Sequence, residues 1–115
     1  MPLCQVFTNV PAPAAAQALL GELSRLLAAQ FDKPERWVMT CLVPKLAMTF
    51  GGTDGPTAFV AVKNIGTMTP ADTQTLSRNL CERLEKDLGV SADRIYVEFT
   101  NAVDTMWGWN GDTFG

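Results

Sequence analysis

The sequence predicts an α+β fold in which two strand–helix–strand (βαβ) units form a four-stranded sheet with two helices on one face. The chain has 115 residues, the length of one domain with a core of its own. Hydrophobic residues make up 47% and charged residues 18%, the balance of an ordinary globular protein. The order strand, amphipathic helix, strand occurs twice, which predicts an internal repeat. We therefore expect a single domain over 1–115, with a pseudo-repeat of about 2–50 and 57–107.

The first unit lies in the N-terminal half. Leu3–Phe7 is a short apolar run that predicts a buried strand. Between Ala14 and Phe31 the leucines recur at helical spacing opposite a polar face, which indicates an amphipathic helix. The helix is expected to end at Asp32-Lys33-Pro34, because a proline disfavours helical backbone at the residue before it. Trp37–Val43 is rich in bulky residues and predicts the second strand.

The second unit repeats this order. Thr57–Ile65 combines β-branched and aromatic residues and predicts a strand. Thr69 as N-cap, Pro70 at the first helical position and an acidic residue two positions later indicate the start of a helix. Leucines then recur at every fourth position until Gly89, which suits the residue after a helix. Arg94–Phe99 predicts the closing strand.

Two βαβ units in so short a chain favour a split-βαβ, ferredoxin-like arrangement. Both helices then cover the same face of the sheet, and no segment remains to cover the other face. The strands read as nearly continuous apolar runs, which is typical of strands buried on both sides. We therefore expect the open face to pack on further copies of the chain.

Charge and composition exclude several classes of function. The formal net charge of −3 argues against a nucleic-acid-binding protein, and no apolar run is long enough to span a membrane. The N-terminus carries no visible secretory signal. The chain contains no histidine, which removes the usual general base and the usual zinc ligand. Cys4, Cys41 and Cys81 are far apart and form no CxxC motif, so a disulfide framework or metal site is not expected.

Two glycine-rich stretches stand out. Phe50–Pro56 joins the two halves and predicts a turn, because no Gly-Lys-Ser/Thr phosphate-binding motif follows it. The tail Trp107–Gly115 holds three large aromatic residues among glycine and asparagine and is not expected to be helical. Such aromatic residues cover either a neighbouring subunit or a pocket, and the sequence favours neither.

Eight short motifs are spread along the whole chain: Met1-Pro2, Thr8-Asn9-Val10-Pro11, Lys33-Pro34, Phe50-Gly51-Gly52, Ile65-Gly66, Asp93-Arg94-Ile95-Tyr96, Gly108-Trp109-Asn110 and Thr113-Phe114. With these motifs the chain resembles the macrophage migration inhibitory factor family of the tautomerase superfamily, which also includes D-dopachrome tautomerase. No single motif is decisive, but together they match the family in order and in a chain of the family's length.

The resemblance implies an unusual base that needs no histidine. Cells normally remove an initiator methionine that precedes a small residue, so removal of Met1 leaves Pro2 with a free secondary amine. In the family this amine moves a proton on a carbon next to a carbonyl and so interconverts keto and enol forms. If Met1 stays attached, Pro2 is an amide nitrogen without a basic lone pair. Lys33 matches the family's cation, which binds a substrate carboxylate or stabilises the enolate oxygen.

Further site residues follow from the same resemblance. Ile65 matches a residue whose backbone amide contacts the substrate. Tyr96, Trp109 and Phe114 match the pocket wall, and we expect Tyr96 and Trp109 to come from the neighbouring subunit. Trp37 stands where the family usually has a tyrosine at the mouth of the pocket.

Several positions depart from the family pattern. Glu98 replaces a pocket asparagine, and Trp107 replaces a smaller residue beside the pocket. Thr57 and Val60 stand at the positions of the vertebrate CxxC, so we expect no thiol–disulfide exchange. The receptor-contacting arginine and aspartate of the vertebrate factor correspond to Ala12 and Lys45.

The expected protein is a homotrimeric barrel that acts on small aromatic 2-keto acids without a metal or other cofactor. The expected reaction is that of a phenylpyruvate tautomerase or L-dopachrome isomerase. A secreted, cytokine-like signalling protein with vestigial catalysis and a receptor partner is the alternative. A trimeric domain without activity is the third interpretation. We expect the cytoplasm as location, or export by a route that needs no signal peptide.

Overall fold

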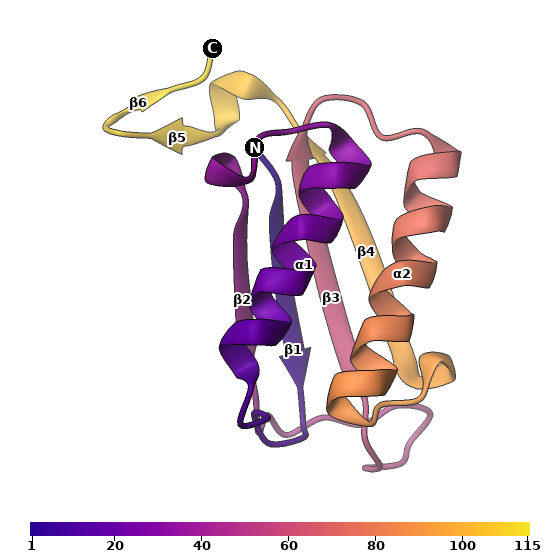
Figure 1. The fold of residues 1–115 in the computed structure, drawn as a ribbon. Helices are drawn as coiled ribbons and strands as arrows, with labels where there is room; N and C mark the ends of the chain where they lie inside the picture. The colour runs from indigo at the N-terminus through magenta and orange to yellow at the C-terminus, as the bar shows by residue number, and fades with distance from the viewer.

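The computed structural model describes residues 1–115 and contains two helices, a four-stranded sheet and a small hairpin (Figure 1). The elements, in chain order, are β1 (Leu3–Thr8), α1 (Ala16–Phe31), β2 (Met39–Val43), β3 (Ala58–Ile65), α2 (Pro70–Leu88), β4 (Ile95–Ala102), β5 (Gly108–Trp109) and β6 (Asp112–Thr113). The predicted strands and helices are all present, with bounds that differ by one to three residues. The largest difference at a strand start is at β2, where a 3-10 turn, Glu35–Trp37, takes up the first predicted residue.

The sheet has the strand order β2-β1-β3-β4. β1 pairs in parallel with β2, β3 pairs in parallel with β4, and the two units join through the antiparallel pair β1–β3. The two parallel strands of each unit are therefore direct neighbours. The expected split arrangement, in which another strand separates them, is wrong, because a split unit depends on long-range pairing that local patterns do not encode.

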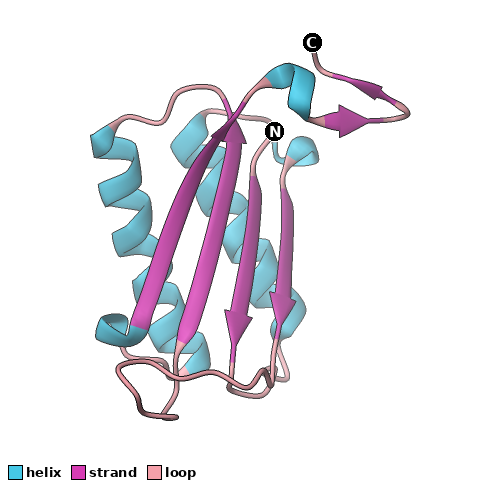
Figure 2. Ribbon diagram, turned by 180° about the vertical axis from the view of Figure 1, so that it is seen from behind, coloured by secondary structure: helices cyan, strands magenta, loops and turns pink.

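Both helices lie on one face of the sheet and run antiparallel to each other (Figure 1), while the opposite face is uncovered (Figure 2). The core forms between them from leucines spaced four apart on each helix and from alternate residues of the inner strands. It contains Cys4, Val6, Leu19, Leu23, Leu27, Val60, Val62, Leu76, Leu80 and Leu84, all fully or almost fully buried. Side chains that recur with the helical period of 3.6 thus pack against side chains that recur with the strand period of 2, and together they form one apolar layer.

The uncovered face mixes apolar and polar side chains. Met39 and Tyr96 are each 66% exposed there, and Phe59 is 37% exposed. Lys63 and Glu98 lie on the same face, on β3 and β4. Apolar and polar residues therefore alternate along the strands more than in the nearly continuous apolar runs that the sequence predicted. The apolar part of this face is the part that a second copy could cover.

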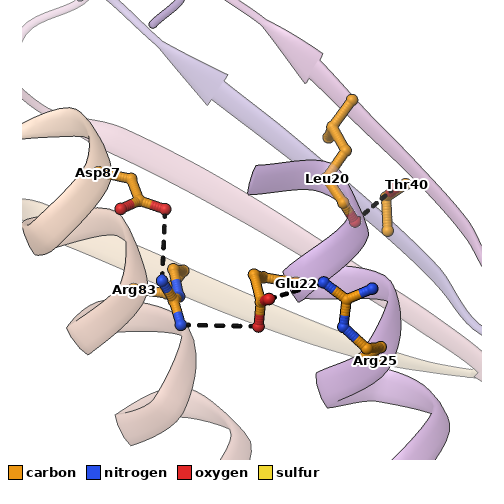
Figure 3. Close-up of polar contacts among 6 residues, drawn as sticks. All are labelled: Leu20, Glu22, Arg25, Thr40, Arg83 and Asp87. Atoms are coloured by element: carbon orange, nitrogen blue, oxygen red, sulfur yellow. Dashed lines mark hydrogen bonds and ion pairs between the residues drawn. The ribbon is translucent and has the colours of Figure 1, made fainter. Parts of the chain in front are cut away.

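An ion-pair chain connects the solvent sides of the two helices (Figure 3). The Glu22 carboxylate lies 2.6 Å from the Arg25 guanidinium and 3.6 Å from that of Arg83, which also reaches Asp87 at 3.6 Å. Exposed pairs of this kind contribute little to stability. Neither helix is both long and apolar enough to cross a membrane.

The start of α2 carries the predicted cap. The Thr69 hydroxyl accepts from the Asp72 amide at 3.1 Å, and the Asp72 carboxylate accepts from the Thr69 amide at 2.9 Å. The hydrogen bond from the Thr69 backbone amide holds the pKa of the Asp72 carboxyl below its usual value, and a hydrogen bond from Gln30 of α1 lowers it further. Gly89 ends the helix with a φ of 69°, a left-handed conformation that glycine adopts without strain.

We predict that Thr69→Ala lowers the free energy of unfolding by about 1 kcal/mol, because it leaves one helix-terminal amide without a partner. Urea denaturation at one fixed protein concentration measures the change, with the concentration held because assembly contributes to stability. Gln74→Ala, an exposed substitution one turn further along the same helix, is the control and changes stability by less than about 0.5 kcal/mol. Equal effects of the two substitutions would mean that the cap contributes nothing.

Candidate active site

The N-terminal strand carries Pro2 into the interior of the protein. Pro2 is fully buried, and its carbonyl accepts a hydrogen bond of 3.0 Å from the Met39 amide at the start of β2. β1 occupies an inner position of the sheet, so β2 and β3 flank it on both sides. The nitrogen that removal of Met1 would free is therefore held by the sheet and not by a flexible terminus.

An apolar hollow of about 320 Å³ opens beside Pro2. This volume and its few polar atoms are typical of a small-molecule site. Residues of the N-terminus and of the C-terminal tail line this hollow, and these two segments lie at the same end of the sheet (Figure 1). The residues that line it are Met1, Pro2, Leu3, Trp37, Met39, Trp107, Gly108, Trp109 and Phe114.

Three aromatic rings form one wall of this hollow. Trp37 meets Trp109 edge-on with ring centroids 4.8 Å apart, and it meets Phe114 in the same way at 6.0 Å. Trp109 and Phe114 stack nearly parallel at 6.0 Å. A flat ring fits a wall of this kind, because aromatic pairs prefer stacked or edge-on contacts.

The tail that supplies this wall is a hairpin of β5 and β6, closed by a 3.2 Å hydrogen bond from the Phe114 amide to the Trp107 carbonyl. The sequence left open whether the aromatic residues of the tail cover a neighbouring subunit or a pocket. In the structure the hairpin covers a pocket of its own chain. The expectation that a neighbouring subunit supplies Trp109 is wrong, because the ring packs on Trp37 of the same chain. The turn between the strands, Asn110-Gly111, has positive φ at both residues and folds the tail back.

Lys33 places a positive charge near the N-terminal amine. It follows Asp32, whose left-handed backbone ends α1, and the Lys33 amide still bonds to the Ala28 carbonyl at 3.0 Å. Lys33 is half-buried at this helix end. Burial lowers the pKa of the amine of Met1 from its usual value, and the charge of Lys33 lowers it further.

The other predicted site residues lie apart from the hollow. Ile65 ends β3 at the Pro2 end of the sheet and is half-buried. Glu98 lies in the middle of β4 on the open face, exposed and hydrogen-bonded to the Thr100 hydroxyl. Two strand spacings separate β4 from β1, so Glu98 does not touch the hollow of its own chain.

Tyr96 lies at the opposite end of the sheet, at the start of β4. Its ring packs on Phe50 with centroids 4.9 Å apart, and both line a shallow surface hollow of about 330 Å³. The guanidinium of Arg94 fixes the adjoining glycine-rich turn with five hydrogen bonds of 2.8–3.4 Å to the 50–56 segment. One chain therefore presents two separate features, a hollow at Pro2 and the exposed ring of Tyr96 packed on the half-buried Phe50.

Three lining residues escaped the sequence analysis: Leu3, Met39 and Gly108. Leu3 and Met39 are register partners on β1 and β2 and both face the open side of the sheet. Strand alternation could have placed them beside each other, but only if the pairing of β1 with β2 were known. Gly108 could have been found from its place beside Trp109.

The thiols do not form a reactive pair. Burial raises the pKa of Cys4 to about 12, and burial also raises the pKa of Cys81. All three cysteines are free, and the Thr57 hydroxyl, at the vertebrate CxxC position, donates to the Arg94 carbonyl at 2.7 Å. A thiol with a raised pKa is a poor nucleophile at neutral pH.

Comparison with known proteins agrees with this geometry. The family model described as macrophage migration inhibitory factor (MIF) matches residues 1–115. The macrophage migration inhibitory factor of Meriones unguiculatus is 38% identical over 114 residues, 99% of each chain, and the homolog from Brugia malayi is 31% identical over 115 residues, the whole of each chain. The crystal structure of a homologue from Prochlorococcus marinus aligns with a TM-score of 0.95 and 46% identity, over 98% of this chain and 99% of that one. The chain therefore belongs to the macrophage migration inhibitory factor family.

Proposed function

We propose that the protein is a keto–enol tautomerase that uses the free amine of Pro2 as its general base after removal of Met1. The substrates are small aromatic 2-keto acids of the phenylpyruvate type, with dopachrome-like compounds as a second class. The observation that carries the proposal is the burial of Pro2 beside an apolar hollow with a cation close to the amine. An amine in such surroundings is neutral at a lower pH than an exposed one, so it can accept a proton near neutrality.

The reaction moves one proton from carbon to oxygen in two transfers. The Pro2 nitrogen takes a proton from the carbon next to the keto group; the electron pair of that C–H bond forms the C=C bond, and the C=O π pair moves to oxygen to give an enolate. The protonated Pro2 amine then gives its proton to the enolate oxygen, directly or through water, which forms the enol and restores the base. In the reverse direction the same two transfers return the proton to carbon and give the keto acid. The pyrrolidine ring holds the nitrogen with little freedom, which favours a productive approach.

The remaining groups bind the substrate and stabilise the charge that develops. The ammonium of Lys33 attracts the carboxylate or the enolate oxygen, and either contact is stronger in a site that excludes water. The rings of Trp37, Trp109 and Phe114 accommodate the aromatic group. Trp107 narrows the hollow, which favours a flat substrate.

The active assembly in this proposal is a homotrimer in which a neighbour completes each site. The exposed Tyr96 and the half-buried Phe50 lie at the end of the sheet away from Pro2, where a second copy can bring its hollow to them. Glu98 lies on the same strand and face as Tyr96 and so reaches the same neighbour. Its carboxylate then weakens binding of an anionic substrate relative to an asparagine.

Cytokine-like signalling is the second candidate, supported by the curated relatives named macrophage migration inhibitory factor. Such signalling needs a receptor surface but no base. Receptor binding that survives Pro2→Gly would favour signalling, whereas loss of enol formation in that variant tests catalysis. A trimer that neither forms the enol nor binds a receptor would support the third interpretation, a trimeric domain without activity.

The first prediction concerns the base. Pro2→Gly, with a free N-terminus verified by mass spectrometry, lowers kcat for phenylpyruvate by about 10²–10⁴-fold, the usual contribution of one acid–base group. Pro11→Gly replaces an exposed proline of the same strand's following turn and leaves kcat unchanged. A loss of less than fivefold in the first variant would exclude Pro2 as the base.

The second prediction concerns Lys33. The charge of Lys33 lowers the pKa of the Met1 amine, and we expect it to act in the same direction on the Pro2 amine that removal of Met1 frees. Lys33→Ala therefore raises the pKa of the Pro2 amine and moves the acid limb of the kcat/KM profile to higher pH. Loss of the contact with the substrate anion also lowers kcat/KM about 10–100-fold. Lys86→Ala, on the solvent side of α2, serves as the control and alters neither quantity. An acid limb that does not move in Lys33→Ala would mean that the charge of Lys33 does not act on the Pro2 amine.

The third prediction tests whether neighbours share a site. Pro2→Gly and Tyr96→Ala homotrimers are each impaired, but unfolding and refolding them together restores part of the activity. In a mixed trimer, a site that takes Pro2 from the Tyr96→Ala subunit and Tyr96 from the Pro2→Gly subunit is intact. Activity of the mixture equal to the average of the two separate variants would place Tyr96 outside the site.

A further inference from the structure

Asn64 is a buried polar residue that no step of the proposed reaction uses. Its side chain is 2% exposed and lies near the end of β3 on the helix-covered face. The Oδ1 atom has no hydrogen-bond partner, and it is the one buried side-chain oxygen or nitrogen in the chain of which this is true. Buried acceptors are almost always paired, because an unpaired one loses its hydrogen bonds to water without replacement.

The strand register places Asn64 beside the N-terminal residue. Cys4 pairs with Val62 and Leu3 with Lys63 in the antiparallel ladder of β1 and β3, so one further step sets Pro2 opposite Asn64. Because side chains alternate between faces, Pro2 and Asn64 both point to the helix-covered side, and both are buried there. Opposed residues on one face of an antiparallel pair are close enough for their side chains to interact.

The donors of the chain near this end of the sheet are already engaged elsewhere. The Gln30 amide donates to Asp72 at 2.9 Å, and the Thr69 amide donates to the same carboxylate. Pro2 brings no donor while Met1 is attached, since an amide nitrogen of proline has no hydrogen. Removal of Met1 creates a donor at this place, the N–H of the Pro2 amine.

We propose that Asn64 is a positioning residue whose Oδ1 accepts a hydrogen bond from the N–H of the mature Pro2 amine. This inference rests on the proposed use of Pro2 as the base and adds how the base is oriented. A neutral secondary amine carries one hydrogen and one lone pair, and the two exchange places by inversion at nitrogen. A fixed acceptor on the side of β3 holds the hydrogen there and so leaves the lone pair directed at the hollow.

The hydrogen bond also changes the proton affinity of the amine. It is stronger when the amine is protonated, so it stabilises the cation and opposes the effects of burial and Lys33. The other charged groups around this end lie on several elements: Asp32 next to Lys33, Glu35 and Arg36 before β2, Asp72 at the start of α2, Lys63 on the open face of β3, and Asp104 and Asp112 of the C-terminal tail. Asp72 is committed to the helix cap, and the sheet separates Lys63 from the helix-covered face.

The test is a titration of the Pro2 amine by nuclear magnetic resonance in Met1-free protein labelled with ¹⁵N-proline. Asn64→Leu keeps the shape of the side chain but removes the acceptor. We expect it to lower the pKa of the amine by about one unit, a tenfold change in the protonation equilibrium. We also expect a lower kcat with little change of KM, since orientation acts on the chemical step. Thr8→Val alters a buried hydroxyl on the same face of β1 at its far end and leaves the pKa unchanged.

Asn64→Asp is the second variant, and we expect it to change the pKa of the Pro2 amine in the opposite direction. A carboxylate at the same place pairs with the protonated amine and raises its pKa. If Asn64→Leu does not fold, Asn64→Asp tests the inference alone, because aspartate has nearly the size of asparagine. An amine pKa that is unchanged in either folded variant would overturn the inference. Because the titration needs no substrate, this failure is distinct from a failure of Pro2 to act as the base.

Discussion

The site depends on the position of β1 inside the sheet. A terminal strand at an edge would leave its first residue free to move, whereas β1 is flanked by β2 and β3 and is held on both sides. The hydrogen bond from the Met39 amide to the Pro2 carbonyl extends this pairing to the second residue of the chain. Every other feature of the site is arranged around that fixed point, because the hollow, the cation and the aromatic wall all meet where β1 begins.

The two faces of the sheet serve different purposes. The helix-covered face carries the core, and its close packing leaves Pro2 and Asn64 buried at one end. The open face keeps exposed aromatic and charged residues, and in the proposed trimer these complete a neighbour's site. Strand alternation therefore separates the core from the expected subunit contact, since successive residues of one strand face the helices and the open side in turn. Pro2 and Asn64 are the exception, because they bring the proposed base and its support to the end of the helix-covered face.

Local signals in the sequence predicted the helices and strands well. The spacing of leucines indicated both helices, and Thr69, Pro70 and Gly89 marked the ends of α2, which the structure confirms. Of the residues that the family resemblance named, Pro2, Trp37, Trp107, Trp109 and Phe114 line one hollow in the structure, whereas Lys33 is not among its lining residues. Their roles in catalysis stay predictions. What failed depends on contacts between distant segments: the neighbouring parallel strands, the Trp109–Trp37 contact within one chain, and the unpaired Asn64. Pairing order and the fold of a nine-residue tail are set by packing in three dimensions, which periodicity does not describe.

The central claim is that catalysis requires a free amine at Pro2. The most direct measurement compares phenylpyruvate tautomerisation by two forms of the same protein, one with Met1 retained and one with Met1 removed, after intact-mass analysis has verified each form. We predict that the Met1-free protein is active and that the Met1-bearing protein is inactive, because acylation removes the basic lone pair of Pro2. Equal activity of the two forms would contradict the account, since the base would then have to be another group.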